Sequence, residues 1–287
     1  MPKLPIILAH GYLGFGQLGP FSYFNNVAQI LQRLGVQNVY ATAVPPKGSL
    51  KDRSELLAQQ IRAHVSNGKV NVIAHSMGGL DARYLIAKGN GRDMIETLTT
   101  LGSPFGGTLA ADIAADPRNL SQIDPKRLIS SIVDFAAATA LRWPFSATDT
   151  HFAIQQLRDA VSKLPGDYSE LGSYFSGLFT IKDAALQELT TSNCKRIFPT
   201  DCSDLAGVEC YSYAGALPPA DVNPILTVAG LVLDAAGLQN DGIVPLDSAK
   251  LPRHMGTLGA DHLGLIGWSS KDVSGCYRDI CQTLASH

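Results

Sequence analysis

The chain has 287 residues, 45% of them hydrophobic, so it can build a sizeable core as one large domain or as two. Its 23 basic and 25 acidic residues give a formal net charge of −2, which excludes the strongly basic character typical of nucleic-acid binding. The longest apolar-rich run, residues 224–237, contains Asp234 and is shorter than the roughly 20 residues of a membrane span. We therefore expect a soluble protein without a transmembrane segment.

The first hundred residues alternate between expected strands and expected helices. Short apolar or β-branched runs predict strands at residues 4–10, 38–44, 69–75 and 95–102. Apolar residues at helical spacing predict helices at residues 21–35, 54–68 and 77–89. Such alternation requires crossover connections, so we expect an α/β fold: a compact parallel sheet of about six strands with helices on both faces.

A long insertion interrupts this rhythm. The next convincing strand after Leu101 begins at Gly207, whereas a crossover needs only a dozen or so residues. Helical spacing recurs at residues 125–143, 154–164 and 180–189. We expect a single domain over residues 1–287 with a helical lid or cap insertion at about 108–200. The broadly apolar stretch 128–143 suits a lid that covers a cleft, although a permanently buried cap helix fits it equally well.

The stretch VNVIAHSMGGLDARYL, residues 70–85, places a serine between an expected strand and an expected helix. Small residues lie two before and two after Ser76, at Ala74 and Gly78. This is the pattern of a nucleophile elbow, in which a sharp turn presents the hydroxyl at the carboxyl edge of a sheet. A plain helix-capping serine is the alternative. We interpret Ser76 as the nucleophile.

A catalytic serine requires a base, and the base requires a group that orients it. Of the seven histidines, His262 alone follows a late glycine-rich loop and precedes an apolar run, which makes it the candidate base. Asp241, in an N-D-G turn before Ile243-Val244, a candidate final strand, is the candidate acid; Asp234 and Asp247 are alternatives. Serine, acid and histidine then follow the chain order of α/β-hydrolases.

The segment LAHGYLGFG, residues 8–16, follows the first expected strand. Gly11 allows a sharp turn there. The backbone N–H of Tyr12 would then point toward a developing oxyanion, together with the N–H of Met77 at the helix start. An ordinary glycine turn is the alternative.

The five cysteines lie at positions 194, 202, 210, 276 and 281, and none has C-x-x-C spacing, so zinc is not expected. Three of them fall within the loop-rich residues 194–210. This grouping predicts at least one disulfide and an oxidising compartment, whereas buried free thiols are the alternative.

These motifs resemble those of the bacterial true lipases of the pseudomonad and burkholderia type, which are α/β-hydrolases acting on triacylglycerols. The resemblance spans most of the chain in order and spacing, and rests on ILAHGYLGFG, VNVIAHSMGGLDARYL, TLTTLGSPFGGTLAADIA, QNDGIVP and DHLGLIGW. It implies a triad of Ser76, Asp241 and His262, oxyanion donors Tyr12 and Met77, and a mobile lid in the position of the insertion.

The chain departs from this family in three ways. Ala74 replaces the first glycine of the elbow. The structural calcium of the family requires an aspartate two residues after the histidine, where this chain has Gly264, and Asp221 alone is a poor site for an ion that takes six or more oxygens. We therefore expect no metal and no cofactor. Only three residues precede the first expected strand, which indicates a compact version of the fold.

The sequence thus predicts a serine ester hydrolase, a lipase that hydrolyses acylglycerols through an acyl-enzyme on Ser76. A carboxylesterase, thioesterase or phospholipase would use the same triad, and a hydrolase-like fold kept for binding is the alternative of another class. The expected partner is a lipid or ester substrate at an oil–water interface, and not nucleic acid. We expect a secreted protein whose export signal has been removed, although a cytoplasmic location remains open.

Overall fold

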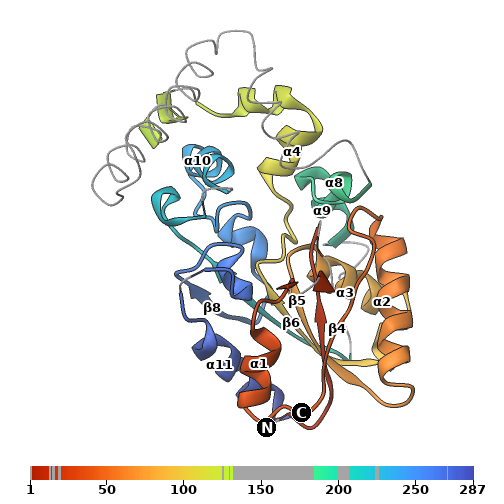
Figure 1. The fold of residues 1–287 in the computed structure, drawn as a ribbon. Coiled ribbons are helices and arrows are strands. Elements are labelled where there is room, and N and C mark those ends of the chain that lie inside the picture. Colours follow the sequence, from red (N-terminus) through yellow and green to blue (C-terminus); the bar gives the residue numbers. More distant parts are fainter. Residues whose placement is uncertain are drawn as a thin grey trace.

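A six-stranded parallel sheet forms the centre of the molecule (Figure 1). The computed structural model describes residues 2–12, 14, 17–18, 21–124, 126–128, 130–131, 184–198, 207–223, 226–269 and 271–287. The sheet has the order β4-β1-β5-β6-β7-β8, and every pairing in it is parallel. Its strands are β1 (Ile6–Ala9), β4 (Val39–Ala41), β5 (Val70–His75), β6 (Ile95–Leu101), β7 (Glu209–Gly215) and β8 (His254–Leu258). The expected sheet of about six parallel strands is therefore confirmed.

Helices cover both faces of the sheet, which explains why its central strands are continuous apolar runs. Along β1, Ile6 and Leu8 point to one face and pack with α1 (Val27–Arg33) and α11 (Ser274–Leu284). Ile7 and Ala9 point to the other face and pack with α2 (Leu50–His64) and α3 (Met77–Lys88). The Oγ of Ser49 caps α2 by accepting from the Asp52 N–H.

A third group of helices lies beyond the carboxyl ends of the strands, toward the top of Figure 1. It shares one apolar cluster with Met77 and Leu80 of α3. Residues 227–235 of the apolar run 224–237 form α10, and most of its buried apolar side chains belong to that cluster. The helices are α4 (Leu109–Ala115), α8 (Ala184–Glu188), α9 (Thr191–Arg196) and α10 (Thr227–Ala235).

Two expected elements differ from the structure. Residues 21–26 are not helical: β2 (Gln17–Leu18) and β3 (Phe21–Ser22) form a small antiparallel pair, and α1 begins only after Asn26, which has φ 59°. Ile243-Val244 is not the final strand, because the Asp241 carboxylate accepts from both of their N–H groups and turns the chain. The final strand is β8 instead.

Most of the expected lid lies outside the described residues, including the stretches 132–143, 154–164 and 180–183. Two described residues anchor the stretch expected at residues 125–143. Leu128 is buried in the cluster with α4 and α10, and Ser131 Oγ lies 2.8 Å from Asp234 Oδ2. The extent of the insertion therefore stays a prediction.

The four described cysteines, at positions 194, 210, 276 and 281, are all free thiols. Cys202 lies outside the described residues. Burial raises the pKa of Cys194 and of Cys276 to about 12, so neither is a reactive thiolate at neutral pH. The expected disulfide does not occur among these four, and the alternative of mostly buried thiols describes them.

Candidate active site

Ser76 occupies a strained turn between β5 and α3. Its backbone has φ 56° and ψ −131°, and it is one of two non-glycine residues with positive φ in the described part of the chain. Such a conformation costs on the order of 1–3 kcal/mol and persists only where the surroundings enforce it. The turn has the geometry expected of a nucleophile elbow.

Close packing around the elbow enforces this conformation. A β-carbon at Gly78 would lie only 2.7 Å from the His10 carbonyl oxygen of the β1 end, and one at Gly79 would lie 2.7 Å from Ser103 Cβ. Ala74 is completely buried where β5 pairs with β1. The alanine that replaces the usual glycine is therefore accommodated.

The candidate acid and base are hydrogen-bonded to each other. His262 Nδ1 lies 2.7 Å from Asp241 Oδ2, and the His262 N–H donates to the Asp241 carbonyl at 2.8 Å. The other carboxylate oxygen of Asp241 accepts from the N–H groups of Ile243 and Val244 at 3.2 and 2.8 Å. These contacts hold Asp241 in place, and its carboxylate orients the imidazole, as a triad acid must.

Gly102, at the end of β6, makes room for this pair. It has φ 57°, and a β-carbon there would lie 3.0 Å from Asp241 Oδ2 and 3.2 Å from His262 Nδ1. Gly215, at the end of β7, has the same function, because a β-carbon there would lie 2.9 Å from Asp241 Cβ. Glycines at two strand ends therefore allow the acid and base to sit directly on the sheet edge.

The alternatives to Asp241 lie elsewhere. Asp234 is bonded to Ser131 through its carboxylate. Asp247 is exposed and pairs with Lys250 Nζ at 2.8 Å. Neither contacts His262, so Asp241 is the carboxylate that the structure brings to the imidazole.

Ser76 and His262 lie at the same edge of the sheet. The ring of His75, the residue before Ser76, has its centroid 4.3 Å from that of His262. Within the described part of the chain, Ser76 makes no hydrogen bond to the His262 ring. Contacts of this kind are commonly long in enzymes without substrate and shorten in the reactive complex.

The loop of His10, Gly11 and Tyr12, here termed the oxyanion loop, passes directly beside Ser76. A β-carbon at Gly11 would lie 2.6 Å from Ser76 Cβ and 3.1 Å from Ser76 Oγ, so only glycine allows this approach. Met77 is the first residue of α3, and the N–H groups of a first helical turn are not used within the helix. The two expected donor segments therefore flank the serine.

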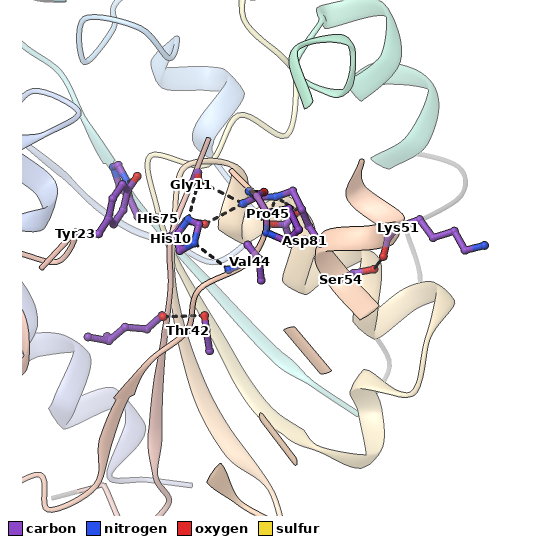
Figure 2. A network of polar contacts seen from close by, with 12 residues as sticks. His10, Gly11, Tyr23, Thr42, Val44, Pro45, Lys51, Ser54, His75 and Asp81 are labelled. Atoms are coloured by element: carbon purple, nitrogen blue, oxygen red, sulfur yellow. Dashed lines mark hydrogen bonds and ion pairs between the residues drawn. The ribbon is translucent and has the colours of Figure 1, made fainter. Parts of the chain in front are cut away.

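A buried ion pair holds the oxyanion loop. The Arg53 guanidinium binds Asp81 at 2.7 Å and donates to the carbonyl oxygens of His10 and Gly11 at 3.0 and 3.3 Å (Figure 2). Both side chains are almost completely buried. Burial outweighs the opposing charge of Arg53 and raises the pKa of Asp81 to about 6. Carbonyl oxygen and the next N–H point in opposite directions in a trans peptide, so holding Gly11 O also fixes the direction of the Tyr12 N–H.

His10 adds a second constraint on the same carbonyl. Its Nε2 accepts from the Val44 N–H at 3.0 Å, so its Nδ1, 2.8 Å from the Gly11 oxygen, carries the proton of the neutral ring. Burial, reinforced by the nearby charge of Arg53, lowers the pKa of His10 to about 4. The neutral ring is therefore the stable form at neutral pH.

The position where the resemblance would place a calcium ion does not suit a metal. Asp261 Oδ1 accepts from the Gly264 N–H at 2.6 Å and Oδ2 accepts from the Asn223 N–H at 2.8 Å. A β-carbon at Gly264 would lie 3.0 Å from Asp261 Oδ1, which leaves no space for a ligating side chain. Asp221 lies in a short 3-10 turn, Pro219–Asp221, and no cluster of three or more metal-binding side chains occurs among the described residues. A carboxylate joins these loops directly.

Several site residues could not be assigned from sequence. His10 and His75 end two of the expected strands, Asp81 lies within the helix expected at residues 77–89, and Arg53 lies just before the one expected at 54–68. Their roles depend on distant partners, such as Arg53 with Asp81, 28 positions away, and His75 with His262, 187 positions away. The available sequence signal is the spacing of Arg53, which lies four and eight positions before Leu57 and Ile61 and so shares their buried face of α2.

Comparison with known proteins identifies the family. The chain is 35% identical over 256 residues to a triacylglycerol lipase of Vibrio cholerae, covering 87% of this chain and 74% of that protein. The chain belongs to the triacylglycerol lipase family. Two further lipases of this family match: triacylglycerol lipase 2 of Saccharomyces cerevisiae, 28% identical over 87% of this chain, and that of Pseudomonas fragi, 31% identical over 47%. The chain spans only 63% and 47% of the length of these two relatives.

Two further comparisons agree with the α/β-hydrolase fold of these lipases. A PGAP1-like alpha/beta domain matches residues 41–117. The mature lipase of Bacillus licheniformis superimposes with a TM-score of 0.67 over 99% of this chain and 92% of that chain, at 18% identity. Lipase 1 from Pelosinus fermentans gives a TM-score of 0.64 over the whole of both chains, at 17% identity. These structural matches concern the fold.

Among the described residues, no helix combines the length and the apolar character that crossing a bilayer requires.

Proposed function

We propose that the protein is a serine ester hydrolase, a lipase that cleaves acylglycerol esters. The observation that carries this proposal is the buried hydrogen bond of 2.7 Å between His262 and Asp241 at the sheet edge where the strained turn presents Ser76. The exposed fractions of Ser76, Asp241 and His262 are 8%, 1% and 7%, so the three groups would react away from bulk water. A desolvated site strengthens every electrostatic contact made in the transition state.

The proposed reaction has two steps. His262 Nε2 removes the proton of Ser76 Oγ, which attacks the ester carbonyl; the tetrahedral intermediate collapses to an acyl-enzyme, and His262 returns the proton to the leaving alcohol. His262 then removes a proton from water, whose oxygen attacks the acyl-enzyme; the second tetrahedral intermediate releases the fatty acid, and His262 returns the proton to Ser76 Oγ. Asp241 keeps the proton on Nδ1 and stabilises the imidazolium that forms in both steps.

The oxyanion of each intermediate would accept hydrogen bonds from the backbone N–H groups of Tyr12 and Met77. Removing one such donor typically costs about 10²–10³ in kcat. The Arg53 contacts to the oxyanion loop support this assignment, because they fix the peptide that carries the Tyr12 N–H before substrate arrives.

An acylglycerol substrate is supported by the names of the relatives, all of which are lipases. The insertion at about residues 108–200 would act as a lid between the catalytic edge and an oil–water interface. No cofactor is required by this mechanism. Secretion stays a prediction, since the described cysteines form no disulfide; fractionation of producing cells measures it.

The test compares the wild-type protein with Ser76→Ala on soluble p-nitrophenyl esters and on emulsified triacylglycerols of increasing chain length, with thioesters and phospholipids alongside. Ser76→Ala should lower kcat by more than about 10⁴-fold. The control Ser54→Ala, which loses a hydroxyl bonded to the Lys51 carbonyl, should be fully active.

Activity that rises above the solubility limit of the substrate supports a lipase. Activity that falls above the solubility limit indicates a carboxylesterase. Preference for thioesters or phospholipids indicates a thioesterase or a phospholipase. If the wild-type protein and Ser76→Ala are equally inactive on every ester, the fold serves binding alone and the proposal is wrong.

A further inference from the structure

The Tyr23 hydroxyl lies between the oxyanion loop and His75 (Figure 2). Its oxygen is 2.8 Å from His75 Nδ1, and the same oxygen packs directly against Gly11. The approach is close, since a β-carbon at Gly11 would lie 2.9 Å from the Tyr23 oxygen. Burial raises the pKa of Tyr23 well above its usual value, so the phenol keeps its proton.

His75 links Tyr23 to the segment of the candidate base. Its Nε2 lies 2.9 Å from the carbonyl oxygen of His262, and its ring is completely buried. A carbonyl can only accept, so Nε2 carries the proton, and Nδ1 of the neutral ring must accept from the Tyr23 hydroxyl. Burial and the neighbouring His262 lower the pKa of His75 well below its usual value, which keeps the ring in this neutral form.

The two hydrogen bonds thus each have a defined donor and acceptor. The Tyr23 oxygen packs against Gly11, the Tyr23 hydroxyl donates to His75 Nδ1, and His75 Nε2 donates to the His262 carbonyl. These contacts connect two segments more than 250 positions apart in the sequence, one carrying a candidate oxyanion donor and the other the candidate base. They pass through His75, the residue immediately before Ser76.

The segment that carries Tyr23 is itself fixed against the loop after His262. Trp268 Nε1 donates to the Tyr23 carbonyl at 2.7 Å, and Asn25 Nδ2 donates to the Gly267 carbonyl at 2.8 Å. The phenol is therefore held from its backbone as well as from its hydroxyl.

We propose that Tyr23 and His75 are positioning residues, which fix the oxyanion loop and the His262 backbone relative to Ser76. Tyr23 does so through the contact of its hydroxyl with Gly11, and the hydrogen bonds Tyr23–His75 and His75–His262 extend this link to the candidate base. This inference rests on the proposed function, because it assigns these contacts a role in the same ester hydrolysis. Neither side chain is assigned a proton transfer to or from substrate.

Tyr23→Phe tests the contacts of the Tyr23 hydroxyl with the smallest possible change. It removes the oxygen that packs against Gly11 and leaves His75 Nδ1 without its donor, while keeping the aromatic ring. We expect kcat on p-nitrophenyl butyrate to fall roughly 10- to 100-fold with KM nearly unchanged, since positioning acts in the transition state. The control Tyr211→Phe also removes a tyrosine–histidine hydrogen bond, 2.9 Å to His287 Nε2 away from the site, and should be fully active.

A second measurement separates positioning from general destabilisation. An alkyl boronic acid that adds to Ser76 mimics the tetrahedral intermediate, so its affinity should fall by the same factor as kcat/KM in Tyr23→Phe, while thermal unfolding stays close to that of Tyr211→Phe. Equal boronate affinity and equal kcat in the two variants would overturn the inference.

Two substitutions at His75 resolve which contact matters. Glutamine can place an amide N–H near the position of Nε2 and keep the donor to the His262 carbonyl, whereas asparagine is too short to reach it. We expect His75→Gln to retain several-fold more activity than His75→Asn at equal folded fraction. The reverse order would overturn the inference.

Failure of this inference is distinguishable from failure of the proposed function. If wild-type protein hydrolyses the ester and Ser76→Ala does not, yet Tyr23→Phe behaves as Tyr211→Phe, only the positioning role is wrong. If wild-type protein shows no Ser76-dependent hydrolysis, the proposed function itself is wrong.

Discussion

His262 and Asp241 are joined twice, through the Nδ1–Oδ2 hydrogen bond of 2.7 Å and through the backbone bond from the His262 N–H to the Asp241 carbonyl at 2.8 Å. The backbone bond keeps the two loops together even when the side-chain bond is altered. Side-chain chemistry at Asp241 can therefore be changed without separating the acid from the base.

Asp241→Asn should preserve the fold and abolish most activity. The amide can donate to Nδ1 and so stabilise the wrong imidazole tautomer, which lowers kcat by about 10³–10⁴-fold in triads of this type. The matched control is Asp247→Asn, an exposed carboxylate near in sequence that pairs with Lys250. Steady-state kinetics check the pair; equal activity of the two variants would remove Asp241 from the mechanism.

Gly102→Ala should disturb the acid–base pair. Its positive φ strains any other residue, and the new β-carbon would lie 3.0 Å from Asp241 Oδ2. We expect a loss of about 1–3 kcal/mol in unfolding free energy and at least a tenfold fall in kcat. Gly68→Ala has the same kind of strain at φ 87° with nothing within 4 Å, so it should lose stability but no activity. Denaturant unfolding and kinetics on both variants make the comparison; intact kcat in Gly102→Ala would contradict it.

Arg53→Met should destabilise the protein by about 3–5 kcal/mol, because it leaves Asp81 buried without its partner. Replacing both residues, in Arg53→Met with Asp81→Leu, should restore much of that stability. The double variant should nevertheless remain slow, since the carbonyls of His10 and Gly11 still lack the guanidinium. Lys250→Met, at an exposed pair, is the control for charge loss. A double variant with wild-type kcat would show that the Arg53–Asp81 ion pair contributes to stability only.

Acid should destabilise the protein through His10. Its pKa is about 4 in the folded protein against 6.5 when unfolded, so below pH 6.5 the unfolded chain binds the proton more readily. The contribution, about 3 kcal/mol, is complete above pH 6.5 and is lost as pH falls to about 4. Asp81, whose pKa is raised to about 6, acts in the opposite direction. Asp81 and His75 are unchanged in His10→Asn, so this variant loses only the contribution of His10. Its unfolding free energy should therefore fall less steeply between pH 6.5 and 4 than that of the wild-type protein. An identical pH dependence would contradict the assignment.

Chelation should leave the protein unaffected. The Asp261 carboxylate joins the loop of His262 directly to Asn223, and both of its oxygens accept backbone hydrogen bonds. EDTA should change neither Tm nor kcat, whereas Asp261→Ala should lower both, since the N–H groups of Asn223 and Gly264 lose their acceptor. The exposed Asp272, which caps Ser274, supplies the control Asp272→Ala. A calcium-dependent rise in Tm would overturn this account.

The elements that depend on local pattern were predictable from sequence. Apolar runs buried on both faces gave the strands, and small residues around Ser76 gave the elbow, because both are dictated by packing within a few residues. The acid and base followed from turn chemistry at Asp241 and from the glycine-rich loop before His262. Triad roles remain proposals, but the structure brings Asp241 and His262 into contact.

The remainder depends on contacts between distant segments. Val44 is 34 positions from His10, and His262 is 187 from His75, so nothing near either histidine reveals its partner. Ile243 and Val244 have a high strand propensity, but their N–H groups donate to the Asp241 carboxylate and not to a neighbouring strand. Tertiary hydrogen bonds of this kind override local preference and cannot be read from periodicity.

The most direct test of the central claim is reaction with diethyl p-nitrophenyl phosphate, followed by mass spectrometry of the intact protein and of its peptides. One diethylphosphoryl group per chain should appear on Ser76, in parallel with complete loss of esterase activity, and His262→Ala should label far more slowly. Full activity after exposure to excess reagent, or a label on a residue other than Ser76, would contradict the account.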